Sequence, residues 1–302
     1  AGAGIRAATP RVHMVSFGTQ MYLDRLADSV SAKEMYAKHW GYTWTLFSED
    51  SLNCSKFRAH RWRGDYRYCK LQALSDVWKT VVQLQNSTNS EQDYLFWHDL
   101  DTHIMRPQRP LTFFIEAAEG APVIFTDNAL SLNNGVFFLQ VSQAGRRFYK
   151  HWKKHCRTGE WPWADNGCMY EALLTLLGGE QYTGRCSTYR KRDFDKDSPE
   201  PPTGPQLMRC FNEEMKTLGM GCCGGSRLID GFRFLTGPEN SFNHHPCSEL
   251  LTSREFVNES RALIQDHCFT EGMFMVHTKN TSYGEVSVRR TVAFTRGSQV
   301  EL

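Results

Sequence analysis

The sequence has no long apolar run. None of the apolar segments in its 302 residues approaches the roughly 20 residues that a membrane-spanning helix needs. The first ten residues, AGAGIRAATP, form a short polar leader and lack the apolar stretch of a signal peptide. We therefore expect any membrane attachment to come from an N-terminal anchor that precedes this sequence.

A strong charge bias is also missing. Lysine and arginine number 35 and aspartate and glutamate 33, which leaves a formal net charge of +2. The overall charge therefore gives no reason to expect nucleic acid as a partner. Hydrophobic residues make up 40% and charged residues 23%, an ordinary globular balance. The length suits one large domain or two small ones, and no internal repeat is visible.

The ten cysteines do not form the C-x-x-C pairs that usually bind zinc. Six of them fall between positions 168 and 247, and the adjacent Cys222 and Cys223 are expected to pair with separate, distant partners. Four N-x-S/T sequons begin at Asn53, Asn86, Asn258 and Asn280. Together these features favour the lumen of the secretory pathway or the cell exterior. The alternative is a cytosolic protein with many buried thiols.

Strand and helix patterns alternate over the first 180 residues. Buried strands are predicted over 11–19, 42–50, 94–101, 121–127 and 133–141. Helices are predicted over 22–41, 68–84, 142–156 and 165–179. This alternation is typical of an α/β fold with a largely parallel sheet that helices cover on both faces.

Residues 181–250 differ in character from the segments before them. The stretches DFDKDSPEPPTGP and GMGCCGG predict loops, and the cysteines indicate a disulfide-braced excursion from Cys186 to Cys247. Regular structure is predicted to resume with a helix over 253–267 and a short strand over 273–278.

The segment YLFWHDLDTHIM places Asp99 and Asp101 directly after an apolar strand. Residues two apart on a strand share a face, and ligands of open α/β sheets bind beyond the carboxyl ends of the strands. Two carboxylates so close repel each other, so a positive partner is expected there. Oxygen ligands of this kind suit Mn²⁺ or Mg²⁺. The alternative is a solvated turn with two acidic residues.

At these residues the sequence resembles the D-x-D motif of GT-A glycosyltransferases, and the wider pattern is similar to the galactosyl/mannosyl/xylosyltransferase group, glycosyltransferase family 34. The similar segments are YLFWHDLDTHIMRP, SLNNGVFFLQVSQAGRRFYKHW, WADNGCMYEALL and MFMVHTKN. The resemblance implies a GT-A (Rossmann-like) catalytic domain over 1–302. Its nucleotide-binding half would span 11–127 and its sugar and acceptor half 128–302.

The resemblance also implies a metal site. Asp99 and Asp101 would hold Mn²⁺ or Mg²⁺, and His277 would complete the set of ligands. Asp99 has a second expected role, which is to bind the ribose of the nucleotide. Lys279 would join the metal in neutralising the leaving diphosphate. For any single histidine, the alternative is a packed or surface residue.

The turn after the first strand is expected to lie under the nucleotide, and its residues are Ser16, Phe17, Gly18 and Thr19. Gly18 would let the backbone approach closely, and Thr19 would bond to the base or ribose. Tyr22 would stack on the base, although a helix aromatic is more often a core residue. Lys70 would reach a phosphate, or else be a solvated helix lysine.

Four residues are candidates to lie beside the transferred sugar. Asn133 and Asn134 would bind its hydroxyl groups, although a plain loop before a strand explains the same letters. The resemblance implies that Asp165 also binds sugar hydroxyls, and Asn166 stands where the family has a glutamine near the anomeric carbon. Asp165 also fits the N-cap of a helix, a purely structural role. Trp161 and Trp163 are expected to offer apolar faces to the acceptor.

These features predict a metal-dependent glycosyltransferase of the secretory lumen, and specifically of the Golgi. The family resemblance implies that it retains the anomeric configuration. It would move a sugar from a nucleoside diphosphate sugar, preferably a UDP-sugar, to a glycan or glycoprotein hydroxyl. Two alternatives stay open. One is a secreted, disulfide-rich carbohydrate-binding module with structural Ca²⁺; the other is a nucleotidyltransferase or phosphohydrolase that uses the same carboxylates. No Walker-type glycine loop supports the latter.

Overall fold

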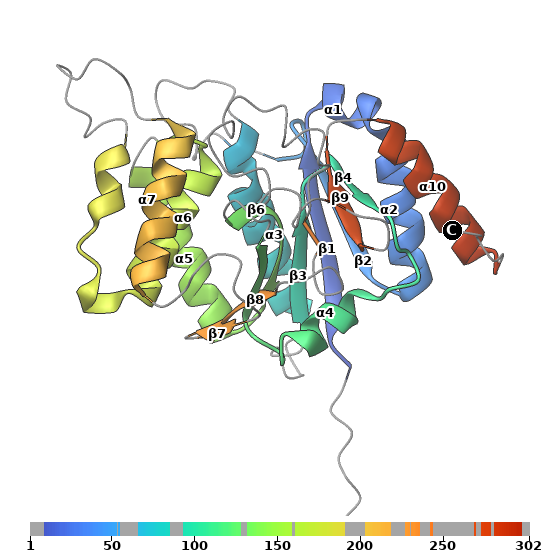
Figure 1. The fold of residues 1–302 in the computed structure, drawn as a ribbon. Helices are drawn as coiled ribbons and strands as arrows, with labels where there is room; N and C mark the ends of the chain where they lie inside the picture. The colour runs from blue at the N-terminus through green and yellow to red at the C-terminus, as the bar shows by residue number, and fades with distance from the viewer. Residues whose placement is uncertain are drawn as a thin grey trace, which may run out of the picture.

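A computed structural model describes residues 9–52, 54, 66–84, 93–127, 132–158, 161–190, 203–218, 227–229, 231–235, 242–243, 269, 273–278 and 281–297 (Figure 1). The strands are β1 Arg11–Gly18, β2 Thr43–Ser48, β3 Asp93–His98, β4 Thr102–Ile104, β5 Val123–Asp127, β6 Leu132–Gln140, β7 Arg227–Ile229, β8 Phe232–Leu235 and β9 Met275–His277. The α-helices are α1 Gln20–Arg25, α2 Ala27–Trp40, α3 Cys69–Leu84, α4 Leu111–Ala117, α5 Gln143–Thr158, α6 Asp165–Leu177, α7 Gly204–Thr217 and α10 Ser282–Thr295.

Seven strands form the central sheet in the order β2-β1-β3-β6-β5-β8-β7, and β4 and β9 form a separate pair. Strands β2, β1, β3, β5 and β8 run in one direction, and β6 and β7 run in the other. The predicted α/β class with a mostly parallel sheet is therefore confirmed, with two antiparallel strands that the sequence pattern did not predict. Only 128–131 separate β5 from β6, which is too short for the crossover that a parallel pair needs.

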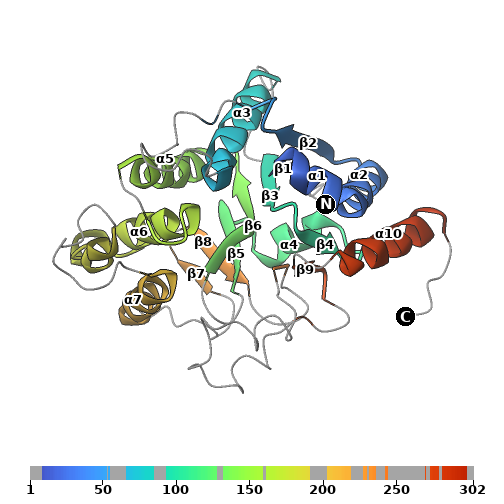
Figure 2. The same ribbon diagram turned by 90° about the horizontal axis from the view of Figure 1, so that it is seen from above.

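Two apolar cores cover the two faces of the sheet, because alternate side chains of each strand point to opposite faces. Val15 and Trp97 belong to the core under α3, α5, α6 and α7. Met14 and Phe96 belong to the other core, under α2 and α4. Figure 2 shows these two helical layers on either side of the strands.

The structure differs from the sequence-based predictions in three places. The helix expected over 22–41 is divided into α1 and α2, with Leu26 between them. The excursion over 181–250 is not wholly outside the fold, because β8 pairs with β5 in the central sheet. Helix α10 was not predicted, since it buries small residues and thus has no apolar stripe. The helix expected over 253–267 lies outside the described residues.

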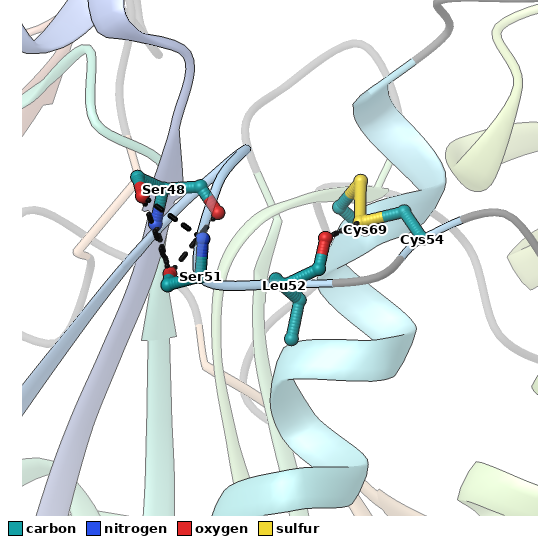
Figure 3. Close-up of a disulfide and its surroundings, with 5 residues drawn as sticks. All are labelled: Ser48, Ser51, Leu52, Cys54 and Cys69. Atoms are coloured by element: carbon teal, nitrogen blue, oxygen red, sulfur yellow. Dashed lines mark hydrogen bonds between the residues drawn. A yellow bond between two sulfur atoms is a disulfide. The ribbon is translucent and has the colours of Figure 1, made fainter.

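Disulfides join the six cysteines of the described part of the chain, as the even cysteine count predicted: Cys54–Cys69, Cys156–Cys168 and Cys186–Cys210. The first bond fixes the chain after a turn at Ser48 and Ser51 to the start of α3 (Figure 3). The expectation for Cys222 and Cys223 falls outside the described residues. Among the described helices, none combines the length and apolar character needed to cross a bilayer.

Loss of the Cys186–Cys210 bond is expected to lower the free energy of unfolding by about 2–4 kcal/mol. This bond closes a loop of 24 residues, whereas Cys156–Cys168 closes one of 12. In the chain-entropy account, removing the disulfide that closes the longer loop lowers the free energy of unfolding more than removing the other one. Urea unfolding of the two double serine variants tests this, and unchanged midpoints in both would contradict it.

Candidate active site

The two aspartates lie on a turn at the carboxyl end of β3, whose six residues are all buried. The backbone N–H of Asp99 donates to Gly135 O at 2.6 Å, which ties the turn to the start of β6. The Thr102 hydroxyl donates to Asp99 O at 2.7 Å and closes the turn from the other side. Because β6 is antiparallel to β3, the end of one strand meets the beginning of the other at this edge.

Helix α2 holds the same turn through a buried cation that the sequence reading missed. Lys33 is fully buried, and its Nζ donates to Asp99 O at 3.1 Å and to Leu100 O at 2.9 Å. One helical turn earlier, the Ser29 hydroxyl donates to Thr102 O at 2.8 Å. Burial lowers the pKa of Lys33 to about 7, although Asp101 and Asp99 favour its charged form. The only sequence signal was a lysine on the inner side of a helix, which apolar periodicity does not reveal.

Asp99, Asp101 and His277 come together at this edge, and one potential ligand atom of each lies within 4.8 Å of the others. His277 follows Asp101 by 176 residues, and its Nε2 is 3.1 Å from Asp101 Oδ1. The separate strand pair causes this approach, because β9 is antiparallel to β4 with His277 opposite Thr102. The histidine is therefore placed by backbone pairing next to the turn that carries both carboxylates.

The second nitrogen of His277 is also engaged. Its Nδ1 is 3.0 Å from Asn243 Oδ1, and Asn243 Nδ2 donates to Asn133 O at 3.0 Å. With Nδ1–H donating to the amide oxygen, Nε2 is the ring nitrogen that faces Asp101, and it can offer a lone pair to an ion once its proton is lost. Histidines that bind metals are commonly oriented in this way. Asn243 was not predicted, since it lies in the cysteine-rich excursion without a recognisable motif.

The electrostatics of the cluster fit a divalent cation. Burial acts to raise the pKa of Asp101, but the attraction of His277 outweighs it and the pKa falls below its usual range. Burial acts to lower the pKa of His277, but the attraction of the Asp101 carboxylate outweighs it and raises the pKa, which favours a proton on the Nε2 that faces Asp101. Two carboxylates and an imidazole are donors that Mn²⁺ accepts, and such an ion would replace that proton.

Lys70 joins Asp99 of the Asp99–Asp101–His277 cluster to the residues expected at the sugar. Its Nζ lies 2.8 Å from Asp165 Oδ2 and 3.3 Å from Asp99 Oδ1, and it donates to Asn134 Oδ1 at 2.6 Å. Burial alone would lower the pKa of Lys70, but Asp165 and Asp99 raise it. The lysine is neither solvated nor free of partners, so it orders two acids and an amide.

Asn134, Asp165 and Asn166 lie together around Lys70. The N–H of Asn134 donates to Asn166 Oδ1 at 2.9 Å, which joins β6 to the start of α6. Asn134 is 1% exposed, and its Nδ2 has no hydrogen-bond partner among the described residues. A buried amide without a partner is costly, so this N–H₂ is a candidate donor to a ligand.

The β1–α1 turn is built differently from the expectation. Ser16 is buried and its hydroxyl donates to His98 O at 2.5 Å, so it joins two strands. Phe17 packs on Tyr66, with ring centroids 6.0 Å apart. A Cβ on Gly18 would lie 2.7 Å from Leu100 Cδ2, which shows that the glycine makes room for the aspartate turn.

Thr19 and Tyr22, two residues expected to bind the nucleotide, lie near that turn. Thr19 Oγ1 is buried without a partner among the described residues, and Tyr22 is half-buried. The expectation for Lys279 lies outside the described residues.

The segment before α6 corrects two expectations. Trp161 is 3% exposed, and its Nε1 donates to His155 O at 3.3 Å, so it offers no face to an acceptor. Asp165 is not the N-cap of α6, because Ala164 occupies that position without a side-chain bond. The Asp165 carboxylate is bound to Lys70 instead.

Gly135→Ala is expected to weaken Mn²⁺ binding by about 10–100-fold, the usual cost of disturbing the support of a metal ligand. A Cβ on Gly135 would overlap His277 Cε1 and would lie 2.8 Å from Nδ1, so the imidazole must move. Calorimetric titration with Mn²⁺ measures the change. Gly284→Ala is the control, because its Cβ would come no closer than 3.3 Å to another atom. Wild-type Mn²⁺ affinity in folded Gly135→Ala would refute the steric argument.

The chain resembles three solved structures over most of its length. A glycosyltransferase involved in glycosylation of the major capsid of PBCV-1 shares 12% identity, covering 94% of this chain and all of that one, at a TM-score of 0.40. The galactosyltransferase LgtC, in complex with donor and acceptor sugar analogues, shares 9% identity. The match covers 96% of this chain and 97% of LgtC, at a TM-score of 0.42. An active-site mutant of LgtC shares 10% identity with the same coverage of both chains, at a TM-score of 0.42.

No protein-family model and no curated protein matches the sequence. What the chain binds is therefore inferred from its own side chains at the sheet edge.

Proposed function

We propose that the chain is a metal-dependent glycosyltransferase that moves a sugar from a nucleoside diphosphate sugar, with UDP-sugars favoured, to a hydroxyl of a glycan or glycoprotein. One observation carries the proposal: the Asp99–Asp101–His277 cluster adjoins a second group at the same edge of the sheet. This second group, called here the Lys70 group, consists of Lys70, Asn134 and Asp165. An ion held by the first group would bind the diphosphate of a nucleotide-sugar. The buried amide and carboxylate of the second group would form hydrogen bonds to the sugar.

The residues of the two adjoining groups have two roles. Asp99, Asp101 and His277 would hold Mn²⁺ or Mg²⁺, which when bound would stabilise the negative charge that grows on the leaving diphosphate. Asn134 and Asp165, both ordered by Lys70, would bind hydroxyls of the transferred sugar.

The remaining predicted contacts belong to the nucleotide and to the acceptor step. Thr19 and Tyr22 would bind the base or ribose, and Lys279 would bind the diphosphate. Asn166 would lie near the anomeric carbon. We propose retention of configuration, with the acceptor proton passing to the leaving phosphate oxygen, so that no separate general base is needed.

A donor screen tests the proposal. Wild-type protein is incubated with UDP-Gal, UDP-Glc, UDP-Xyl, UDP-Ara or GDP-Man and Mn²⁺, and free nucleoside diphosphate is measured with and without EDTA. Release of UDP that EDTA stops is the expected result. Glycan binding without turnover would favour the carbohydrate-binding module, and release of sugar 1-phosphate would favour a nucleotidyltransferase or phosphohydrolase.

We further propose that the protein acts in the Golgi lumen. The three disulfides within the described residues support a compartment that permits disulfide formation. Immunofluorescence of the full-length protein with a Golgi marker tests the location.

A further inference from the structure

The turn before α6 has an unusual backbone. Trp163 and Ala164 both have positive φ, at 60° and 48°, and Ala164 has a ψ of −111°. Residues other than glycine rarely adopt such angles, and when they do the surrounding structure must enforce them. These two strained residues directly precede Asp165, which pairs with Lys70, and Asn166, which accepts a hydrogen bond from Asn134 N.

Hydrogen bonds fix the turn at both ends. Ala164 N donates to Trp161 O at 3.1 Å, and Asn166 N donates to Trp163 O at 3.1 Å. On the far side, Trp152 Nε1 donates to Asp165 O at 3.1 Å. Any movement of the Trp163 backbone therefore also displaces Asp165 and Asn166.

Helix α7 packs against the outside of this turn. A Cβ on Gly204, the first residue of α7, would overlap the Trp163 indole. One turn later Leu207 approaches Gly167, where an added Cβ would lie 3.0 Å from Leu207 Cδ2. Farther along, Phe211 stacks on Tyr170 of α6 with ring centroids 4.2 Å apart.

Two local features in turn fix α7. Its N-terminus carries a capping box between Thr203 and Gln206, and the Cys186–Cys210 disulfide anchors its middle. The helix is therefore a firm support, and Gly204 is the point at which it touches the strained turn.

We propose that α7 is a brace that keeps the 161–164 turn in its strained form and so aims Asp165 and Asn166 at Lys70 and Asn134, with Gly204 as a positioning residue. The inference rests on the proposed glycosyl transfer, because the aim of Asp165 matters only where a sugar is bound. The excursion with the disulfide thereby acquires a part in catalysis although it contributes no group to the reacting atoms.

Gly204→Ala in the full chain tests the brace. We expect kcat for UDP release from a donor that the wild type turns over to fall by about 10–100-fold, as small misplacements of positioning groups do. Mn²⁺-dependent UDP binding, measured by calorimetry, should keep its wild-type value, because the metal cluster does not touch the turn. Glu213→Ala, on the exposed side of the same helix, is the matched control and should retain full turnover.

A rescue separates positioning from a general loss of structure. Ala164→Gly added to Gly204→Ala should recover most of the turnover, because glycine adopts positive φ freely and lets the turn follow the displaced indole. If Gly204→Ala does not fold, Trp163→Phe tests the same contact and should lower kcat with UDP binding unchanged.

Wild-type kcat in Gly204→Ala, an equal loss of UDP binding and turnover, or a folded double variant without recovery would each overturn the brace. A wild type that releases no nucleotide from any donor would instead overturn the proposed function itself.

Discussion

Asp101→Ala is expected to abolish UDP release and to remove the Mn²⁺ dependence of UDP binding. Asp101 is the carboxylate that faces His277, and its pKa lies below the usual range because that histidine attracts it. It is thus the most reliably ionised ligand of the cluster. Disturbing a mere support of a metal ligand costs about 10–100-fold, so removing the ligand should cost more than about 100-fold. Calorimetry with UDP, with and without Mn²⁺, measures the loss.

Two further variants make this test specific. Asp101→Asn keeps the shape of the side chain and removes only the charge, and it should be nearly as inactive as Asp101→Ala. Glu34→Ala removes an exposed carboxylate of α2 and should behave as wild type. Metal-dependent UDP binding that survives in folded Asp101→Ala would remove the aspartate from the metal site.

His277→Ala is expected to lower turnover by about 10–100-fold or more, and excess Mn²⁺ should restore part of it. The histidine would supply one of three ligands, so its loss weakens the binding of the ion without removing the carboxylates. The Mn²⁺ concentration for half-maximal UDP release should therefore rise. A loss of turnover that no Mn²⁺ concentration relieves would contradict the role of His277 as a ligand.

Asn134→Ala provides the matched contrast. Asn134 touches Lys70 but is not among the three potential metal ligands. Its loss should therefore impair sugar transfer at every Mn²⁺ concentration while the half-maximal Mn²⁺ concentration stays at the wild-type value. Equal shifts in both variants would mean that the two clusters act as one metal site.

The carboxylates could be predicted from the sequence because local rules place them. A buried strand followed by D-x-D puts Asp99 and Asp101 at the edge of a sheet, whatever the rest of the chain does. His277 needed the family resemblance as well, because only the pairing of β4 with β9 brings it to that edge. The helix predicted over 68–84 also follows from a local pattern, and Leu71 and Leu74 on its inner side are fully buried in α3.

The residues that support the site could not be predicted in this way. Lys33 and Asn243 act through backbone carbonyls and through a histidine ring, and neither kind of contact leaves a periodic pattern. The positive charge expected beside the aspartates is supplied in part by Lys33 and Lys70, so the crowding of carboxylates alone does not require a metal. It is the addition of His277 that makes the cluster a donor set for an ion.

The pairing of β4 with β9 also sets the time at which the site can form. Asp101 and His277 are 176 residues apart, and synthesis at roughly 5–20 residues per second separates them by about 9–35 seconds. During that interval the nascent chain carries both aspartates, with Lys33 and Lys70 already made, but it has no histidine to complete the cluster. The ability to bind the ion with all three ligands therefore arrives only when β9 pairs with β4. Mn²⁺ affinity would thus report the formation of this strand pair in a newly made chain.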